Sequence, residues 1–314
     1  DEAIRESANL IIAHHPIIFK GLKSITGKNY VERAIIKAIK HDVAIYAIHT
    51  NLDNVMGGVS HRMASVLGLK EIKVLQPGRQ TLQKLTTFVP KSSTDRVLAA
   101  LHEAGAGQIG KYSACSFRVE GTGTFLPGED AQPTLGERGR LEYAQEDRVE
   151  VILPAYLQAS VLAALRQAHP YEEVAYYLHT LENENQHVGC GVVGELDVEM
   201  PTMEVLQRVK TVFKSGCVRH TAITKASIKR IALCGGAGSF LLPRAIQEAA
   251  DLFISADFKY HEFFDADGRI TIADIGHYES EQYTKDLLAE VLREKFPTFA
   301  VNFSKTITNP ISYL

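Results

Sequence analysis

The sequence has 314 residues, 45% of them hydrophobic, and a formal net charge of −3 at pH 7. A chain of this length can bury a large core, and we expect about two domains. Acidic and basic residues are interspersed and no apolar stretch approaches the roughly 20 residues of a membrane span, which argues against a nucleic-acid-binding or membrane protein.

The first 80 residues alternate short apolar runs with helical patterns. Strands are predicted at LIIA (10–13) and VAIYAI (43–48), with a helix over 31–40 between them. This alternation is typical of a βαβ unit in a parallel sheet. A second helix is predicted over 59–67, where Gly68 ends it, and a strand follows over 71–75.

The pattern changes between residues 82 and 181. The predicted elements are a strand (84–89), a helix (94–104), two strands (114–123 and 141–153) separated by a long loop, a second helix (155–169) and a last strand (175–181). The order β-α-β-β-α-β is typical of a ferredoxin-like fold. We therefore expect an inserted domain over 81–190, and a second domain formed by 1–80 together with 191–314.

The last third returns to alternating helices and strands. After GCGVVGEL we expect helices over 202–213, 240–250 and 281–295, and strands at 228–233, 252–255 and IADIGH (272–277). The predicted fold class is α/β, with a mostly parallel sheet in the main domain, interrupted by the ferredoxin-like α+β insert.

The cysteines indicate a reducing compartment. The four of them, Cys115, Cys190, Cys217 and Cys234, form no CxxC pair, which favours reduced thiols and a cytoplasmic protein. The chain starts without methionine and soon enters a strand, so we expect an N-terminal segment of the natural protein to be missing.

Histidines stand at the ends of three predicted strands. His14 and His15 follow the first strand, His49 the second and His277 the last. Side chains just after parallel strands gather at one edge of a sheet, so these can meet in one pocket. Because the adjacent His14 and His15 point in different directions, we expect each to bind its own ion.

Two of these histidines have a carboxylate four residues later. Asp53 follows His49 and Glu281 follows His277, a spacing that puts both side chains on one side of a turn entering a helix. The two oxygens of Glu281 can bridge two cations. His49 is either a ligand itself or a residue that orients Asp53.

This set of side chains predicts a metal centre. Imidazole and carboxylate without a thiolate suit Zn²⁺, Fe²⁺ or Mn²⁺, and two such ions would activate water and polarise a carbonyl or phosphoryl oxygen of a substrate. The predicted ligands are His14, His15, Asp53, His277 and Glu281. We interpret the other histidines as ordinary polar residues, namely His41, His61, His102, His169, His179, His187 and His220.

Two further motifs each have two interpretations. In SADFKYHE, Asp257, Lys259 and His261 are candidates for substrate contact or proton transfer, or else they belong to a charged surface turn. CGGAGSF (234–240) either presents backbone N–H groups to a phosphate or is a plain tight turn.

The motifs AHHP, HTNLD, CGG, SADFKYHE and GHYESE resemble, in order and approximate spacing, those of the GTP cyclohydrolase 1 type 2 homologues, also called Nif-three-like dinuclear metal proteins. The resemblance covers residue 4 to about 77 and about 191 to 303. The region between, with HPYEEVAYYLHTL, resembles the PII-like or CutA-like domain inserted in longer members. Members of the family carry an additional strand and helix before the AHHP strand.

The resemblance also implies a ligand arrangement and an assembly. His14 and Asp53 are expected on one metal ion, His15 and His277 on the other, with Glu281 bridging both. The assembly it implies is a toroidal homo-hexamer whose metal sites face an internal cavity and whose inserted domains cap the openings.

Three functions are compatible with these features. The first is a metal-dependent hydrolase acting on a nucleotide or related small molecule, of the GTP cyclohydrolase kind by resemblance. The second is a non-enzymatic protein for metal storage, delivery or regulation, whose inserted domain binds an effector. The third is a purely structural metal site.

Overall fold

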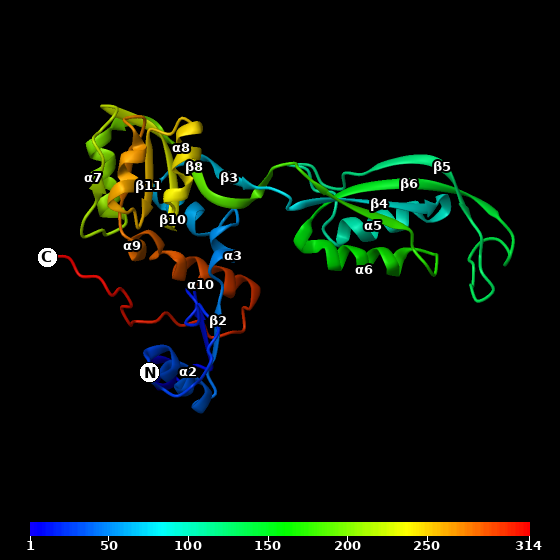
Figure 1. Cartoon of the computed structure of the whole chain (residues 1–314), viewed down its shortest axis with the longest axis horizontal. Coiled ribbons are helices and arrows are strands. Elements are labelled where there is room, and N and C mark those ends of the chain that lie inside the picture. Colours follow the sequence, from blue (N-terminus) through cyan, green and yellow to red (C-terminus); the bar gives the residue numbers. More distant parts are fainter. The chain divides into compact units, whose positions relative to one another are not determined.

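The computed structural model describes all 314 residues, and they form two compact units (Figure 1). The first unit comprises Asp1–Pro77 and Gln186–Leu314, and the second comprises Gly78–Asn185. Each unit has its own buried hydrophobic core. None of the helices combines the length and the apolar character that a membrane crossing requires.

A six-stranded sheet forms the centre of the first unit. Its order is β3 (Lys70–Gly78), β8 (Asn185–Pro201), β10 (Ser227–Ala237), β11 (Leu252–Ala256), β12 (Thr271–Asp274) and β9 (Arg219–His220). β11 lies parallel to β10 and to β12, whereas β8 and β9 pair antiparallel with their neighbours β10 and β12. The sheet is therefore mixed, and the expectation of a mostly parallel sheet is not met.

The long strand β8 is one of the elements that the sequence analysis did not predict. Gly189, Gly191 and Gly194 interrupt its apolar pattern, and glycine normally weakens a strand. In the structure the glycine at 194 permits a close approach, because a Cβ there would lie 2.9 Å from the carbonyl oxygen of Lys70. The glycines thus allow tight packing beside β3 rather than ending the strand.

Helices cover both faces of this sheet. α4 (Val59–Leu67) and α7 (Thr202–Val212) contribute to one core, and α8 (Leu242–Gln247) contributes to the other. Successive strand residues alternate between the two cores, as Ile231 and Ala232 do. The result is a three-layered α/β/α arrangement.

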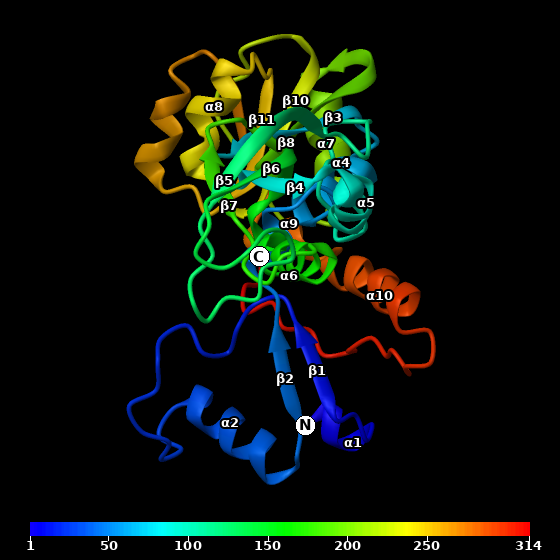
Figure 2. The same cartoon turned by 90° about the vertical axis from the view of Figure 1, so that its right-hand side faces the viewer.

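The N-terminal strands form a separate small sheet. β1 (Leu10–Ala13) and β2 (Ala44–Ala47) are parallel and lie side by side, with α2 (Tyr30–Lys40) connecting them (Figure 2). The predicted βαβ unit is confirmed, but it does not join the six-stranded sheet. A short helix, α1 (Glu2–Arg5), precedes it.

Short helices follow the strands that carry the predicted ligands. α3 (Thr50–Asp53) begins soon after β2, and α9 (His277–Glu281) begins soon after β12. The predicted final helix, from about residue 281 to 295, is confirmed as α10 (Thr284–Lys295), which starts three residues later than expected, and the short helix α9 before it was not predicted. Gly276 at φ +93° makes the sharp turn into α9.

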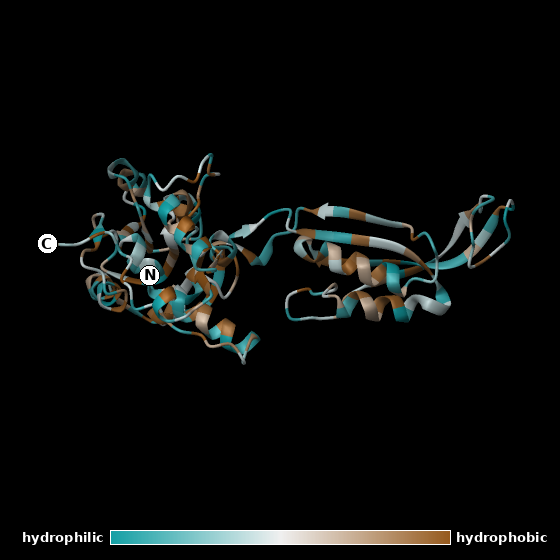
Figure 3. Cartoon of the chain, turned by 90° about the horizontal axis from the view of Figure 1, so that it is seen from below, coloured by the Kyte–Doolittle hydropathy of each residue, from teal (hydrophilic) through white to brown (hydrophobic).

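The second unit has a four-stranded antiparallel sheet with two helices. Along the chain its elements are β4 (Leu82–Pro90), α5 (Thr94–Glu103), β5 (Phe117–Phe125), β6 (Glu142–Pro154), α6 (Gln158–Ala168) and β7 (Tyr176–Leu181). The strand order is β5-β6-β4-β7. Both helices share a core with one face of the sheet, and hydrophobic and hydrophilic residues alternate along these elements (Figure 3). The assignment of this unit to a ferredoxin-like, PII-like or CutA-like class stays a prediction.

Candidate metal centre

The parallel strands β1 and β2 end side by side, which brings the N-terminal histidines together. The backbone N–H of His49 donates a 2.8 Å hydrogen bond to the carbonyl oxygen of His14, continuing the ladder beyond both strands. The rings of His14 and His15 lie with their centroids 4.7 Å apart at an angle of 68°. Adjacent residues therefore present their rings in different directions, as expected at a strand end.

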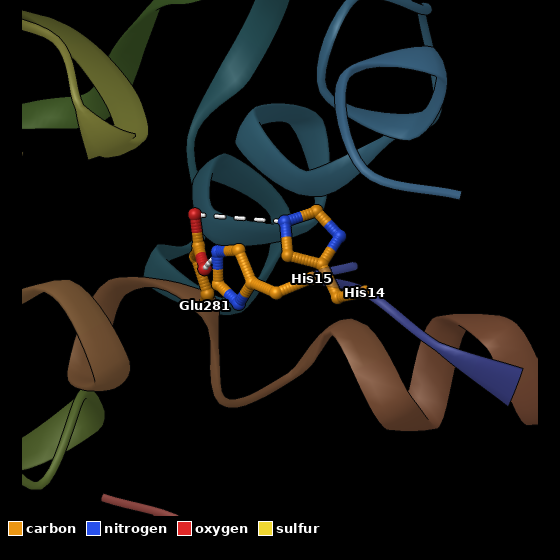
Figure 4. A group of neighbouring side chains, drawn as sticks. All are labelled: His14, His15 and Glu281. Carbon is orange, nitrogen blue, oxygen red and sulfur yellow. Dashed lines mark ion pairs between the residues drawn. The ribbon is translucent and has the colours of Figure 1, made fainter. Parts of the chain in front are cut away.

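The carboxylate of Glu281, from the last residue of α9, lies between these two histidines (Figure 4). Its Oε1 is 3.6 Å from His14 Nε2 and its Oε2 is 3.2 Å from His15 Nε2. One ligand atom from each of these three residues lies within 4.8 Å of the others, a grouping that can hold a metal ion.

Two further predicted ligands join this group, one on each side. Asp53 Oδ1 lies 3.3 Å from His14 Nε2, and His277 Nε2 lies 3.3 Å from Glu281 Oε2. His277 Nε2 is also 3.3 Å from His15 Nε2. The donors thus form two sets, with His14 and Asp53 near Oε1 of Glu281 and the other two histidines near Oε2.

Several buried polar atoms of the cluster lack a hydrogen-bond partner, and this observation tests whether a cation fits the site. His14 Nε2 and Asp53 Oδ1 are both buried without a hydrogen-bond partner. Unsatisfied buried polar atoms are rare, and a cation between these two would satisfy both. His14 Nδ1 is also buried without a partner, so packing rather than a hydrogen bond holds that ring.

The metal-free cluster binds protons strongly. Burial lowers the pKa of His14, but the negative charges of Asp53 and Glu281 outweigh it and raise this pKa to about 9. The contacts of His277 with Glu281 and Asp257 likewise raise its pKa to about 9. Burial raises the pKa of Glu281, but the two histidines outweigh it and lower this pKa to about 2. The site therefore attracts positive charge.

His15 differs from the other two histidines. Burial and the neighbouring imidazoles of His14, His277 and His49 lower the pKa of His15, although Glu281 acts in the opposite direction. A neutral imidazole offers a lone pair to a metal ion without first losing a proton. The His15 side chain is 42% exposed, whereas those of His14 and Glu281 are each 10% exposed.

Among the residues that the SADFKYHE motif singled out, Asp257 contacts the cluster. Its Oδ2 lies 2.7 Å from Nδ1 of His277. Asp257 has a left-handed backbone, with φ +57°, at the turn after β11. Lys259 and His261 make no hydrogen bond or ion pair with the cluster. They interact locally, Lys259 N–H with Glu262 and the His261 ring with Tyr260.

His49 lies beside the cluster without a polar side-chain contact to it. Its ring centroid is 5.7 Å from that of His14 and 5.2 Å from that of His15. The Phe19 ring packs edge-on against it at 5.7 Å. The backbone N–H of Asp53 donates a 3.3 Å hydrogen bond to the carbonyl oxygen of His49, but the His49 ring makes no hydrogen bond to the Asp53 carboxylate. The ring therefore does not orient that carboxylate through a hydrogen bond.

The glycine-rich segment CGGAGSF lies against the same cluster. Its residues 234–237 are the end of β10, where the pairing with β11 is irregular, and do not form the tight turn that the sequence allowed. Gly236 has φ +62°, and a Cβ there would lie 2.5 Å from Glu281 Oε1 and 3.2 Å from His277. Its N–H donates a 2.9 Å hydrogen bond to Ser280 Oγ. Gly236 therefore leaves room for the Glu281 carboxylate at the end of β10, a role the sequence analysis missed. The only signal in the sequence was a glycine pair after a strand.

Comparison with known proteins gives consistent matches. A model of the family described as Duf34/NIF3 (NGG1p interacting factor 3) matches residues 1–310. A Halalkalibacterium halodurans protein named GTP cyclohydrolase 1 type 2 homolog is 42% identical over 320 residues, covering 100% of this chain and 86% of that protein. A Bacillus subtilis protein of the same name is 40% identical, with the same coverage.

A solved structure agrees with these sequence matches. The crystal structure of a Bacillus cereus protein related to NIF3 superposes with a TM-score of 0.84 at 38% identity, covering 100% of this chain and 85% of that chain.

Proposed function

The chain belongs to the Duf34/NIF3 family, and from this membership and the geometry around Glu281 we propose that it binds two divalent metal ions and hydrolyses a nucleotide or related small molecule. The observation that carries the proposal is the division of donors between the two Glu281 oxygens. One carboxylate with a separate donor set at each oxygen suits a bridge between two ions.

In this proposal each ion has its own ligands. His14 and Asp53 would hold the more buried ion, His15 and His277 would hold the more exposed one, and Glu281 would serve both. Nitrogen and oxygen donors without a thiolate suit Zn²⁺, Fe²⁺ or Mn²⁺. Ions bound there would polarise a substrate oxygen and lower the pKa of a water molecule.

The exposures of the side chains indicate where a substrate approaches. His15 and His277 are 42% and 34% exposed, whereas His14 and Glu281 are 10% exposed. A substrate therefore reaches the cluster from the side of His15 and His277. Asp257, at 50% exposure, stands on this side and holds the Nδ1 proton of His277.

Metal analysis combined with a hydrolysis screen tests the proposal. The relatives' name makes GTP the first substrate to try, with release of formate and phosphate measured across a nucleotide panel. We expect two metal ions per chain by elemental analysis, and turnover that is lost on chelation and restored by one of the three metals. Zero or one ion after gentle purification would contradict the dinuclear site. Two ions without turnover on any nucleotide would contradict the hydrolase.

Two bound ions without turnover on any nucleotide would favour the alternative of metal storage, delivery or regulation. The second unit supports this alternative with a cavity of its own, described below. Metal that exchanges reversibly with a chelator at working concentrations, without turnover, is the expected behaviour of such a protein. A purely structural site would instead show slow exchange and a large drop in melting temperature on chelation.

By the same family resemblance, the proposed assembly is a toroidal homo-hexamer in which the second unit is a PII-like or CutA-like insert. Light scattering tests the assembly, since a hexamer has six times the 34.6 kDa mass of the chain. A monomer or dimer at micromolar concentration would overturn it.

A further inference from the structure

The second unit contains a cavity whose lining residues lie between positions 88 and 177, and none of them is a predicted metal ligand. Its volume is about 650 Å³, within the range of roughly 300–1,000 Å³ that small-molecule pockets occupy. It lies on the face of the sheet opposite the two helices, where β5, β6 and the end of β4 meet the segments 126–135 and 171–177. All of its lining residues belong to this one unit.

Hydrogen bonds fix the loop between β5 and β6 against the turn before β7. The N–H of Gln132 donates a 2.8 Å hydrogen bond to Glu172 Oε1, and Thr134 Oγ1 donates one of 2.8 Å to the carbonyl oxygen of Pro170. Near the base of the loop, the Gly139 N–H donates to the carbonyl oxygen of Pro127 at 2.9 Å. The loop is thus held as a wall of the cavity.

Glu146 of β6 is a buried carboxylate that lines this cavity. It is 7% exposed, and its Oε1 accepts one 2.9 Å hydrogen bond, from the Tyr171 hydroxyl. Its Oε2 accepts none, and no Lys, Arg or His forms an ion pair with it. The carboxylate can therefore accept further hydrogen bonds, and a cation is the best donor because it also balances the negative charge.

The surroundings of Glu146 leave its second oxygen open. Gly123 lies on the neighbouring strand, where a Cβ would be 2.1 Å from Glu146 Oε2. A side chain at position 123 would therefore force the Glu146 carboxylate to move from this position. Burial and the hydrogen bond to Glu146 raise the pKa of Tyr171, which keeps that hydroxyl protonated and donating.

The remaining charges of the lining favour a cationic ligand. Its single guanidinium, that of Arg148, is already paired with Glu150 at 2.6 Å. Glu172 and Glu173 add further negative charge at the same cavity. The walls are largely apolar and carry four aromatic rings, which suit an organic cation because ring faces attract positive charge. These rings belong to Phe88, Phe125, Tyr171 and Tyr177.

We propose that this cavity binds a small organic cation, a primary amine with an apolar body, whose ammonium group donates to Glu146 Oε2 while its body packs against the aromatic walls. The proposal goes beyond the metal centre and does not depend on it, because no residue of that centre lines the cavity. It gives the second unit a binding role of its own.

Calorimetric titration of the full-length chain with benzylamine tests this site. We expect saturable binding in the millimolar range or tighter, and binding weaker by roughly 10- to 100-fold in Glu146→Gln, which keeps the shape and removes the charge. Glu103→Gln, which alters an exposed carboxylate of the same unit outside the lining, is the matched control and should bind like the wild type.

A second variant and a second ligand keep the test decisive. Gly121→Leu should block the cavity, because a Cβ there meets nothing within 4 Å and the backbone angle is unrestricted. Benzyl alcohol, the neutral analogue, should bind at least roughly tenfold more weakly than benzylamine. Equal binding of both ligands, equal binding to Glu146→Gln and wild type, or no binding of benzylamine would each overturn the proposal.

The result of the benzylamine titrations can also be distinguished from the results of the experiments on the metal centre. The same titrations after chelation should give unchanged benzylamine affinity, since the site contains no predicted metal ligand. Affinity that disappears with the metal would place the amine at the metal centre and contradict the cavity assignment. Failure of the nucleotide screen would leave these titrations unaffected.

Discussion

Oδ2 of Asp257 lies 2.7 Å from Nδ1 of His277, while the other ring nitrogen of His277 lies 3.3 Å from Glu281 Oε2. One carboxylate therefore holds the proton-bearing side of the imidazole and leaves Nε2 directed at the cluster. Carboxylates in this position commonly orient metal-binding histidines and increase their basicity. Asp257 is thus a positioning residue of the proposed site.

Removal of the Asp257 side chain should weaken metal binding. We expect Asp257→Gly to lower metal affinity by roughly 10- to 100-fold, measured by competition with a chromogenic chelator. Glycine tolerates the φ of +57° at this position, so the variant tests the side chain without adding backbone strain.

The control for this experiment is Asp267→Gly, at another left-handed position with an exposed carboxylate. It should bind metal like the wild type. Asp257→Asn should lose less affinity than Asp257→Gly, because an amide oxygen can still accept from Nδ1. Equal affinity of Asp257→Gly and wild type would remove the positioning role.

Loss of the Glu281 carboxylate should empty both metal positions, because each depends on one of its oxygens. We expect metal content to fall from two ions per chain to near zero in Glu281→Gln. In Asp53→Asn it should fall to about one, because Asp53 contacts His14 alone. Elemental analysis of the dialysed proteins measures this difference. Glu294→Gln, on the exposed end of α10, should retain the wild-type content.

Metal binding near neutral pH should release protons. The pKa values of His14 and His277 are about 9 without metal, so both are protonated at pH 7.5 and must lose a proton to bind an ion. Titration calorimetry in buffers of different ionisation enthalpy should show about two protons released per chain. If His14→Gln and His277→Gln released as many protons on metal binding as the wild type, this expectation would be contradicted.

The same raised pKa values predict how stability changes with pH in the metal-free protein. Since folding raises these pKa values above the ordinary histidine value of 6.5, the stabilisation is fully present below pH 6.5 and is lost as the pH rises through about 9. Thermal melts of the chelated protein from pH 6 to 10 measure this. A metal-free protein that becomes more stable over this interval would contradict the expected sign.

Gly236→Ala should disturb the cluster directly. The new Cβ would lie 2.5 Å from Glu281 Oε1, and φ is +62°, so we expect a loss of stability of about 1–3 kcal/mol together with loss of metal. Gly268→Ala is a matched control, because φ there is +64° and a Cβ would meet nothing within 4 Å. The control should share the backbone strain but keep its metal. Equal metal content in both variants would show that the contact with Glu281 is unimportant.

Asp251 stabilises the first unit away from the metal centre. It is 8% exposed, accepts hydrogen bonds from the N–H groups of Lys229 and Arg230 at 3.0 and 2.9 Å, and pairs with Lys225. We expect Asp251→Ala to reduce the free energy of unfolding by about 1–3 kcal/mol in urea denaturation, since two backbone N–H groups lose their acceptor. Asp265→Ala, an exposed residue, should change it little.

The effect of Asp251 should also depend on pH. Burial raises the pKa of this carboxyl, but Lys225 and the two backbone N–H groups outweigh it and the pKa is lowered from 3.8. Its contribution is therefore present above pH 3.8 and is lost as the pH falls through the lower folded-state value. The difference between wild type and Asp251→Ala should shrink in strong acid.

Local signals in the sequence predicted individual elements well. The helix predicted over 59–67 has the same bounds in the structure, because Gly68 supplies the left-handed residue that ends it. The mixed sheet could not be predicted in this way. It depends on the pairing of β8 with β10, which brings together residues such as Gly194 and Ile231 that are far apart in the sequence.

Within the site, too, local patterns were predictable and contacts between distant segments were not. Ligand-type residues after three strands were visible, because strand ends and four-residue spacings are local patterns. The contact of Asp257 with His277 and the need for a glycine at 236 were not, since both depend on how β10, β11 and α9 pack together. The two interpretations of His49 also could not be separated, and in the structure its ring packs beside its neighbours without a polar contact.

The cluster joins segments that are far apart in the sequence: His15 and His277 are 262 positions apart, yet their Nε2 atoms lie 3.3 Å apart. The residues of the second unit lie between these segments in the sequence. The cluster can therefore be complete only after the second unit and α9 have both been translated. A fragment that lacks α9 would carry the two histidines without the carboxylate between them.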